Sequence, residues 1–275
     1  MRNLLCANFF RLWRSAAFWV SVAVMFAIGV FEVVISGQPK LLGAEGILDN
    51  RYMIFVLLSG VVLSAFCSLF AGVEHSDGTM RNKIIAGHSR AAVYLSCLTA
   101  CSAAGVMVCC GYILPVIVFG VPLLGPFVTE IPALLWFTIC AFIMTAALCA
   151  VFTMIVMLNQ NKAPAAIICI FLAYFLLFLG IYLNSRLTEQ AVIPAREYIE
   201  NGQILVREAM PNPEYVQGVK RMIFECVYDL PGCQAVQLLA EAGDGCPVRL
   251  PLISLLAGTV CTLVGLAMFR RKDLK

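Results

Sequence analysis

Six stretches of the chain are long and apolar enough to cross a lipid bilayer as helices. The hydrocarbon core of a bilayer is about 30 Å thick, and a helix needs about 20 apolar residues to span it. Pro132, Pro164 and Pro251 lie near the starts of three stretches, where the missing N–H of proline is harmless. The predicted spans are residues 16–36, 53–73, 92–118, 132–157, 164–184 and 251–269.

The composition supports a polytopic, all-α membrane protein. Hydrophobic residues make up 61% of the 275 residues and charged residues only 13%, against about a quarter in soluble proteins. The net charge of +3 is small and no basic stripe is interleaved with aromatic residues, so nucleic acid is not an expected partner. We expect residues 1–275 to form one transmembrane domain in contact with the lipid bilayer.

The basic residues predict the orientation, because short cytoplasmic loops carry most Lys and Arg. With a cytoplasmic N-terminus, the short outside loops hold only Lys40 and Arg51. Six spans then return the C-terminus to the cytoplasm, so we expect a multi-pass cell-membrane protein with both termini inside. The cytoplasmic basic residues would be Arg2, Arg11, Arg14, Arg81, Lys83, Arg90, Lys162, Arg270, Arg271, Lys272 and Lys275.

Residues 1–15 alternate arginine and asparagine with leucine and aromatic residues. This pattern predicts an amphipathic helix in the cytoplasmic interface, with its arginines near anionic headgroups. A frayed leader that only sets the topology is the alternative. Pro115, near the outer end of the third span, is expected to end or kink that helix.

A compact polar insert, residues 74–91, separates the second and third spans. A free helix of about two turns would be marginal in water, so the membrane or a partner must hold it. A basic loop that only sets the topology is the alternative reading. The expected pattern is a cap from Ser76 or Asp77, a helix start at Thr79, an end at Gly87 and a second cap at Ser89.

Within this short helix the apolar and basic residues fall on different faces. Met80 and Ile84 share one face, with Ile85 expected at its edge, whereas Arg81, Asn82 and Lys83 project elsewhere. One side is therefore apolar and the other basic, which favours a docking surface for a partner.

The insert resembles the corresponding segment of ABC-2 type transporter permeases, notably in bacterial two-component systems whose ATPase is a separate chain. Residues 269–275 are similar to the cytoplasmic tail of that family. Together with six spans, the resemblance covers nearly the whole chain. The insert residues that carry it are Glu74, Gly78, Thr79, Arg81, Asn82, Lys83, Gly87, Ser89, Arg90 and Tyr94.

The resemblance implies an exporter of an amphiphilic, peptide or lipid-like substrate, powered by a separate ABC ATPase subunit. A second permease chain, in a homodimer or heterodimer, would complete the pathway. This chain has no G-x-x-x-x-G-K-[ST] segment, so we expect ATP hydrolysis on the partner and no enzymatic activity here. The implied ATPase-coupling residues are Glu74, Asp77, Gly78, Thr79, Arg81, Asn82 and Lys83.

Residues 185–250, between the fifth and sixth spans, have a soluble composition and predict an extracellular helical loop. Asn212-Pro213 predicts a helix start, Pro231-Gly232 its end, and a second short helix is expected near 234–241. The resemblance implies that these helices form part of an outer gate. A small cap without a gating role is the alternative.

The cysteines divide into two groups. Most lie in or beside the spans, where cysteine packs as a small apolar residue. Outside remain Cys226, Cys233 and Cys246, of which Cys233 and Cys246 are the expected disulfide pair in an oxidising exterior. No Cys and His cluster has zinc spacing, so we expect no metal or other cofactor.

Other functions remain compatible with the sequence. An ion-coupled secondary transporter normally places polar residues near the membrane midplane. Glu32, the one acid well inside a predicted span, gives this alternative its only support, and it lies close to the outer end of its helix. A non-transporting membrane scaffold or immunity protein is also compatible. The paired carboxylates or activated serine of a membrane-embedded enzyme are not recognisable.

Overall fold

The structure is a computed structural model that describes residues 1–37, 47–159, 161–194, 196–200, 203–207, 209–240 and 246–272. Its helices are α1 (Arg2–Arg14), α2 (Ala16–Ser36), α3 (Ile47–Met53), α4 (Phe55–Ser76), α5 (Thr79–Ile85), α6 (Arg90–Leu124), α7 (Ile131–Leu158), α8 (Lys162–Leu187), α9 (Gly218–Tyr228), α10 (Gln234–Ala240) and α11 (Arg249–Arg271). Its strands are β1 (Val192–Ile193), β2 (Arg196–Glu200), β3 (Gln203–Arg207) and β4 (Met210–Pro211).

Six helical segments of the described chain are long and apolar enough to cross a membrane, which confirms the predicted class. Five of them are α2, α6, α7, α8 and α11, and the second in chain order runs from Leu48 to Glu74. Pro115 does not end the third span, because α6 continues to Leu124. Membrane helices tolerate proline where neighbouring groups satisfy the freed carbonyl.

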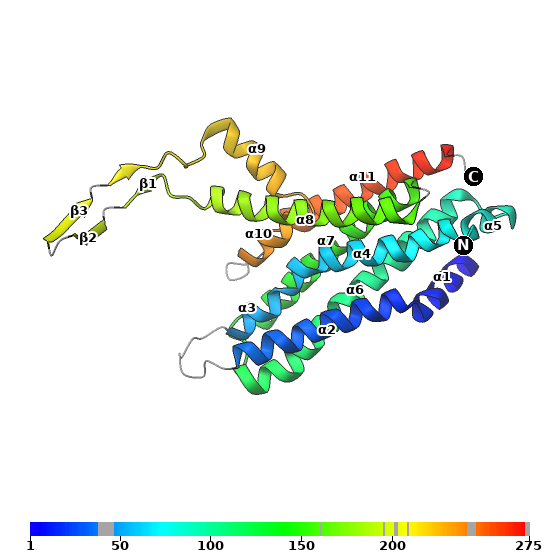
Figure 1. Cartoon of the computed structure of the whole chain (residues 1–275), viewed down its shortest axis with the longest axis horizontal. Coiled ribbons are helices and arrows are strands. Elements are labelled where there is room, and N and C mark those ends of the chain that lie inside the picture. The colour runs from blue at the N-terminus through cyan, green and yellow to red at the C-terminus, as the bar shows by residue number, and fades with distance from the viewer. Residues whose placement is uncertain are drawn as a thin grey trace.

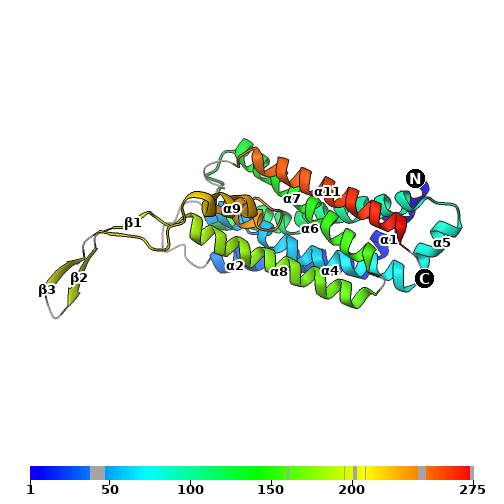
Figure 2. The same cartoon turned by 90° about the horizontal axis from the view of Figure 1, so that it is seen from above.

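The spans pack side by side into one bundle, as Figure 1 shows. α1, α5 and the end of α11 lie together at one end of the bundle, and the view from above in Figure 2 agrees. The strands extend beyond the opposite end. Segments from the start, the middle and the end of the sequence therefore meet at the α5 end.

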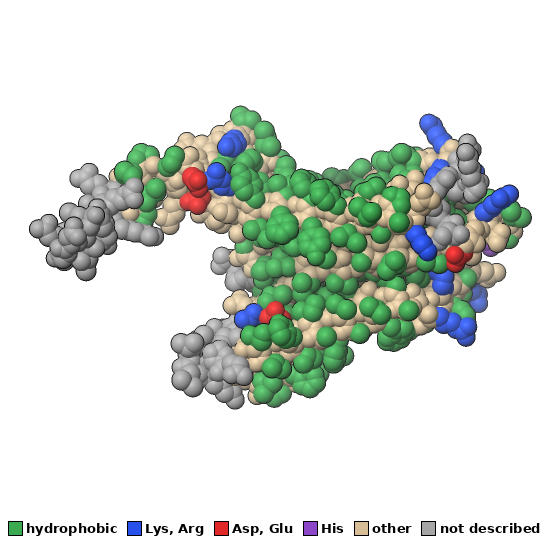
Figure 3. Space-filling view, in the orientation of Figure 1, with side chains coloured by type: hydrophobic (Ala, Val, Ile, Leu, Met, Phe, Trp, Pro, Cys, Tyr) green, Lys and Arg blue, Asp and Glu red, His purple; other side chains and the backbone are tan. Residues whose placement is uncertain are grey.

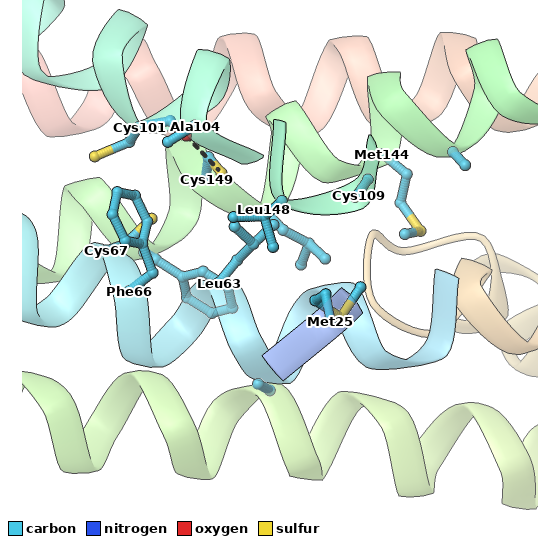
Figure 4. Packing of buried hydrophobic residues seen from close by; sticks show 14 of the residues in the cluster. Met25, Leu63, Phe66, Cys67, Cys101, Ala104, Cys109, Met144, Leu148 and Cys149 are labelled. Atoms are coloured by element: carbon cyan, nitrogen blue, oxygen red, sulfur yellow. Dashed lines mark hydrogen bonds between the residues drawn. The ribbon is translucent and has the colours of Figure 1, made fainter. Parts of the chain in front are cut away.

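Apolar side chains of mixed size, from cysteine and alanine to phenylalanine, fill the interior of the bundle (Figure 4). Met25, Leu63 and Leu148 are buried there together with several cysteines. The Cys149 thiol donates to the backbone carbonyl of Cys101 across 3.5 Å, which joins α7 to α6. These cysteines pack as small residues, as the sequence predicts.

The outer surface separates apolar from charged residues. In the space-filling view of Figure 3, hydrophobic side chains cover the middle of the bundle, and Lys and Arg gather at the end that carries α1 and α5. An apolar band with a basic end is the surface that a polytopic membrane protein presents to its bilayer.

The first half of the 185–250 segment forms strands, so the all-α prediction is wrong there. β1 pairs antiparallel with β4, and β2 pairs antiparallel with β3, with Glu200 opposite Gln203. Val192 pairs with Pro211, which lies far along the chain. Helical periodicity within a short window does not report such pairing.

The predicted helix at Asn212-Pro213 begins later, at Gly218. Asn212 Oδ1 accepts from the Glu214 N–H at 2.9 Å, and Asn212 Nδ2 donates to Glu189 at 2.9 Å. The asparagine thus makes a side-chain turn that holds this segment beside the end of α8. α10 agrees with the second predicted helix and packs against α4, α7 and α8.

Candidate functional site

The candidate site is the turn from α4 through α5 into α6, at the end of the bundle where α1 also lies (Figure 1). Gly78, with φ +65°, begins α5, and Gly87, with φ +89°, follows its end. Glycine adopts these left-handed angles without steric cost. Ser89 Oγ accepts from the Ala92 N–H at 3.2 Å and caps α6 as predicted.

The predicted cap of α5 is wrong. Gly78 occupies the cap position, and no side chain of the described residues caps the helix. The Thr79 hydroxyl instead donates to the Glu74 carbonyl at 3.2 Å, which ties the first turn of α5 to the end of α4. The sharp turn needs a left-handed residue here, and that requirement favours glycine over a serine or aspartate cap.

Glu74 is the centre of the site. Its side chain is fully buried, and its Oε1 lies 2.5 Å from Lys83 Nζ and in ion-pair contact with the Arg11 guanidinium. The same guanidinium lies 4.0 Å from the centroid of the Phe70 ring. A buried carboxylate requires such partners, because an isolated charge in an apolar interior is strongly destabilising.

Lys83 extends this ion cluster to α6 through Asn8. Lys83 Nζ donates to Asn8 Oδ1 at 3.0 Å, and Asn8 Nδ2 donates to Ser96 Oγ at 3.0 Å. Asn8 and Ser96 are both buried. We call Asn8, Arg11, Glu74, Lys83 and Ser96 the Glu74 network; it joins α1, α4, α5 and α6.

The predicted coupling residues therefore divide into two groups. Glu74 and Lys83 belong to the Glu74 network and face the protein. Asp77, Arg81 and Asn82 are exposed. Lys83 was expected to project with Arg81 and Asn82, but the buried carboxylate draws its ammonium inward.

Two apolar residues of α5 differ in their solvent exposure. Met80 is buried, as its predicted apolar face requires, whereas Ile85 keeps 73% of its surface exposed. Ile85 lies one helical turn from Arg81 and beside Asn82 in space, as expected for residues three and four apart. We call Arg81, Asn82 and Ile85 the α5 outer surface.

Sequence reasoning missed Asn8, Arg11 and Ser96 as members of the site. A signal was present for two of them, because Asn8 and Arg11 are three residues apart and share a face of the predicted first helix. Ser96 gave no such signal. It lies among apolar residues of a span, and only tertiary packing reveals its partner.

A second polar contact at the same end holds the end of α11. Arg90 donates to the backbone carbonyls of Phe269 at 3.4 Å, Arg270 at 3.1 Å and Lys272. Lys272 Nζ in turn donates to the Met157 carbonyl at 3.1 Å, near the end of α7. Burial lowers the pKa of Lys272. Positive groups satisfy the free carbonyls at helix C-termini and complement the helix dipole.

Glu32, the acid predicted inside the first span, lies in an ion pair. Its Oε2 is 2.8 Å from Arg51 NH1, and about a fifth of its side chain is exposed. The Tyr112 hydroxyl donates to the Arg51 carbonyl at 2.9 Å. The pair joins α2 to α3 near the end of the bundle opposite α5, away from the Glu74 network.

The expected Cys233–Cys246 disulfide is not formed in the structure, where both residues are free thiols. Cys233 Sγ donates to the Leu176 carbonyl of α8 at 3.3 Å. Cys246 shares a side-chain hydrogen bond with Cys140 of α7. The two thiols therefore face different spans: Cys233 contacts α8, and Cys246 contacts α7.

Compared with known proteins, the chain matches no family model and no curated sequence. Among the described residues, no group of three or more His, Cys, Asp or Glu side chains is arranged to hold a metal ion. The geometry of the α5 end is thus the main guide to function.

Proposed function

We propose that the chain is the transmembrane permease subunit of an ABC-2 type transporter. In this proposal a separate ATPase subunit binds the α5 outer surface, and a second permease chain completes the pathway. The complex exports an amphiphilic, peptide or lipid-like substrate across the cell membrane. Both termini and α5 lie in the cytoplasm.

The observation that carries the proposal is a short helix that is anchored to the bundle on one side and exposed to solvent on the other. α5 has seven residues, so it would not be stable in isolation. The Glu74 network anchors it through Lys83, and the Thr79 bond anchors its first turn. Arg81, Asn82 and Ile85 remain exposed. The α5 outer surface is basic and partly apolar, and its helix is anchored at two points. Such a surface is suited to binding a protein partner.

The same network supports a route for mechanical coupling. A displacement of α5 would act on α4 through Glu74 and on α1 and α6 through Asn8. α4 and α6 are membrane spans, so movement of the docked ATPase would repack the bundle. A loop that only set the topology would need neither the buried carboxylate nor its partners.

The decisive experiment is purification of the full chain from its native membranes, with the bound proteins identified by mass spectrometry. We expect an ATP-binding-cassette ATPase in equal amount to the permease, with two copies of each. Arg81→Glu should lose the ATPase, because a repulsive or unmatched charge in a desolvated contact costs about 2–5 kcal/mol. Arg2→Glu, another exposed arginine at this end, is the matched control and should retain it.

The alternative outcomes are distinct. A stable, transport-active monomer without any ATPase would overturn the proposal and favour an ion-coupled transporter. Unchanged ATPase binding and transport in Arg81→Glu, at normal expression, would remove the α5 outer surface from the interface. Loss of the ATPase in Arg81→Glu is not expected to follow from a folding defect, because Arg81 is exposed in the free chain.

A further inference from the structure

A groove of about 490 Å³ lies between α6, α7 and α11. Its lining extends over residues 139–150 of α7 and 254–263 of α11, the middle of both spans. Figure 2 shows α11 beside α7 in this part of the bundle. At about 1.5 Å per residue the lining of α7 is about 16 Å long, roughly half of a 30 Å hydrocarbon core.

Residue size explains the concave shape of the groove. Its lining includes three alanines of α7 and Gly258 of α11. A Cβ added to Gly258 would lie 3.3 Å from the Ala147 Cα, so the two helices approach closely here. The larger Ile139, Leu255 and Leu263 also line it and are 48%, 53% and 61% exposed, so they form a rim on the outer surface.

Three of the four hydroxyl groups in the lining, those of Ser254, Thr259 and Thr262 but not of Ser102, donate hydrogen bonds within the described part of the chain. Thr259 Oγ1 donates to the Leu255 carbonyl and Thr262 Oγ1 to the Gly258 carbonyl, each at 2.7 Å. Ser254 Oγ donates to Gln234 Oε1 at 2.5 Å. The lining residues that the structure describes include no Asp, Glu, Lys or Arg. A polar or charged occupant would therefore lose its hydrogen bonds to water without gaining hydrogen bonds from these hydroxyl groups, which is unfavourable.

We propose that this groove binds one hydrocarbon chain of a membrane lipid. The groove is continuous with the apolar surface that the spans present to the bilayer, and it carries no charge to match a headgroup. Its position at mid-span keeps headgroups away, and its length fits part of a chain that descends from one leaflet. This binding is independent of any ATPase and goes beyond the proposed transport function.

The test is photolabelling in phosphatidylcholine vesicles that contain a trace of phosphatidylcholine with a diazirine near the end of one acyl chain. Mass spectrometry should find more label in peptides covering 139–150 and 254–263 than on the exposed face of α8 around Phe171, which is 72% exposed. Ala146→Trp should remove this excess because the ring fills the groove. Ala23→Trp adds the same bulk to an exposed position of α2 and should leave the excess unchanged.

Thr259→Trp provides a second variant, since Thr259 is exposed and the change narrows the groove from its rim. It should also lose the excess label. Equal labelling of the groove and α8, or an unchanged excess in both groove variants, would overturn the proposal. A cross-link between two chains through Leu255→Cys, with loss of label on association, would assign the groove to a second copy and would equally overturn it.

Discussion

Glu74 combines a fully buried carboxylate with two cationic partners. From sequence it was one acid in a polar insert, without a sign of burial. Its location at the end of an apolar span explains why the carboxylate is buried, because α4 packs within the bundle up to that point. The charge then requires Arg11 and Lys83 from other helices. At this scale, the sequence identifies the charged residues of the insert, but it does not show which of them is buried or which residues pair with it.

Replacing Glu74 by leucine should destabilise the protein by about 3–5 kcal/mol, because two cations lose the carboxylate at their centre. Thermal unfolding of the purified protein in detergent measures the change. Arg81→Leu alters an exposed charge nearby and should shift stability by about 0.5 kcal/mol or less. A triple variant with leucine at Arg11, Glu74 and Lys83 should recover part of the loss. Equal stability of Glu74→Leu and Arg81→Leu would contradict this role.

Tyr94 provides a second test on a single residue. Its hydroxyl is buried without a hydrogen-bond partner in the described part of the chain. Tyr94→Phe removes this group and should raise stability by about 1–3 kcal/mol in the same unfolding assay. Gly265→Ala should be destabilising, because its new Cβ would clash with the Tyr94 hydroxyl and would lie 2.9 Å from Tyr94 Cζ and Met154 Cγ. Gly265→Ala should be better tolerated when it is combined with Tyr94→Phe than when it is made alone; an equal penalty would show that the tyrosine contact is not limiting.

At the scale of elements, the spans were predictable from the sequence, and the structure of the 185–250 segment was predictable only in part. Long apolar runs predict helices from local composition, so the first span agrees with α2 at both ends, 16–36. The β1–β4 and β2–β3 pairs join separate segments, which a local window does not report. The start of α9 differs because Asn212 turns the chain instead of capping a helix. The start of the short helix in the insert, Thr79, was predicted correctly, but the inward and outward faces of that helix depend on tertiary contacts.

Arg90 joins α6 to the end of α11, a contact that the sequence did not predict. It donates to three carbonyls at the end of α11. Arg90→Ala should therefore speed hydrogen exchange in the last turn of α11, measured by mass spectrometry, without altering exchange in α2. Arg90→Lys should retain only part of the protection, since lysine lacks the planar fork of donors. The exposed Arg271→Ala is the control, and equal exchange in all three variants would contradict the contact.

At the scale of the whole molecule, polar contacts concentrate at the two ends of an apolar bundle. At the α5 end, the Glu74 network joins α1, α4, α5 and α6, and Arg90 with Lys272 joins α6, α11 and α7. At the other end, Glu32 pairs with Arg51, and Gln234 contacts Ser254. The contacts at the α5 end share α6 and form one connected unit, whereas the two pairs at the other end join different elements. Motion at α5 would pass between membrane spans mainly through this unit, as the proposed function requires.

The orientation of the whole molecule can be tested with two cysteines near the end opposite α5. Cys226 of α9 is exposed, whereas Cys233 is buried and its burial raises the pKa of the thiol to about 11. Thiolates react and thiols do not, so at neutral pH a membrane-impermeant maleimide should label Cys226 in intact cells and leave Cys233 unlabelled. Each is kept alone on a background without other cysteines.

Arg81→Cys on the same background reports the opposite side, because position 81 is exposed at the α5 end. It should react only after the cells are permeabilised, since the distribution of basic residues predicts a cytoplasmic position for this end. With both native cysteines retained, denaturation without reductant should make Cys233 and Cys246 reactive, as expected for free thiols. Labelling of Arg81→Cys in intact cells would reverse the orientation, and it would also exclude a cytoplasmic ATPase from the α5 outer surface.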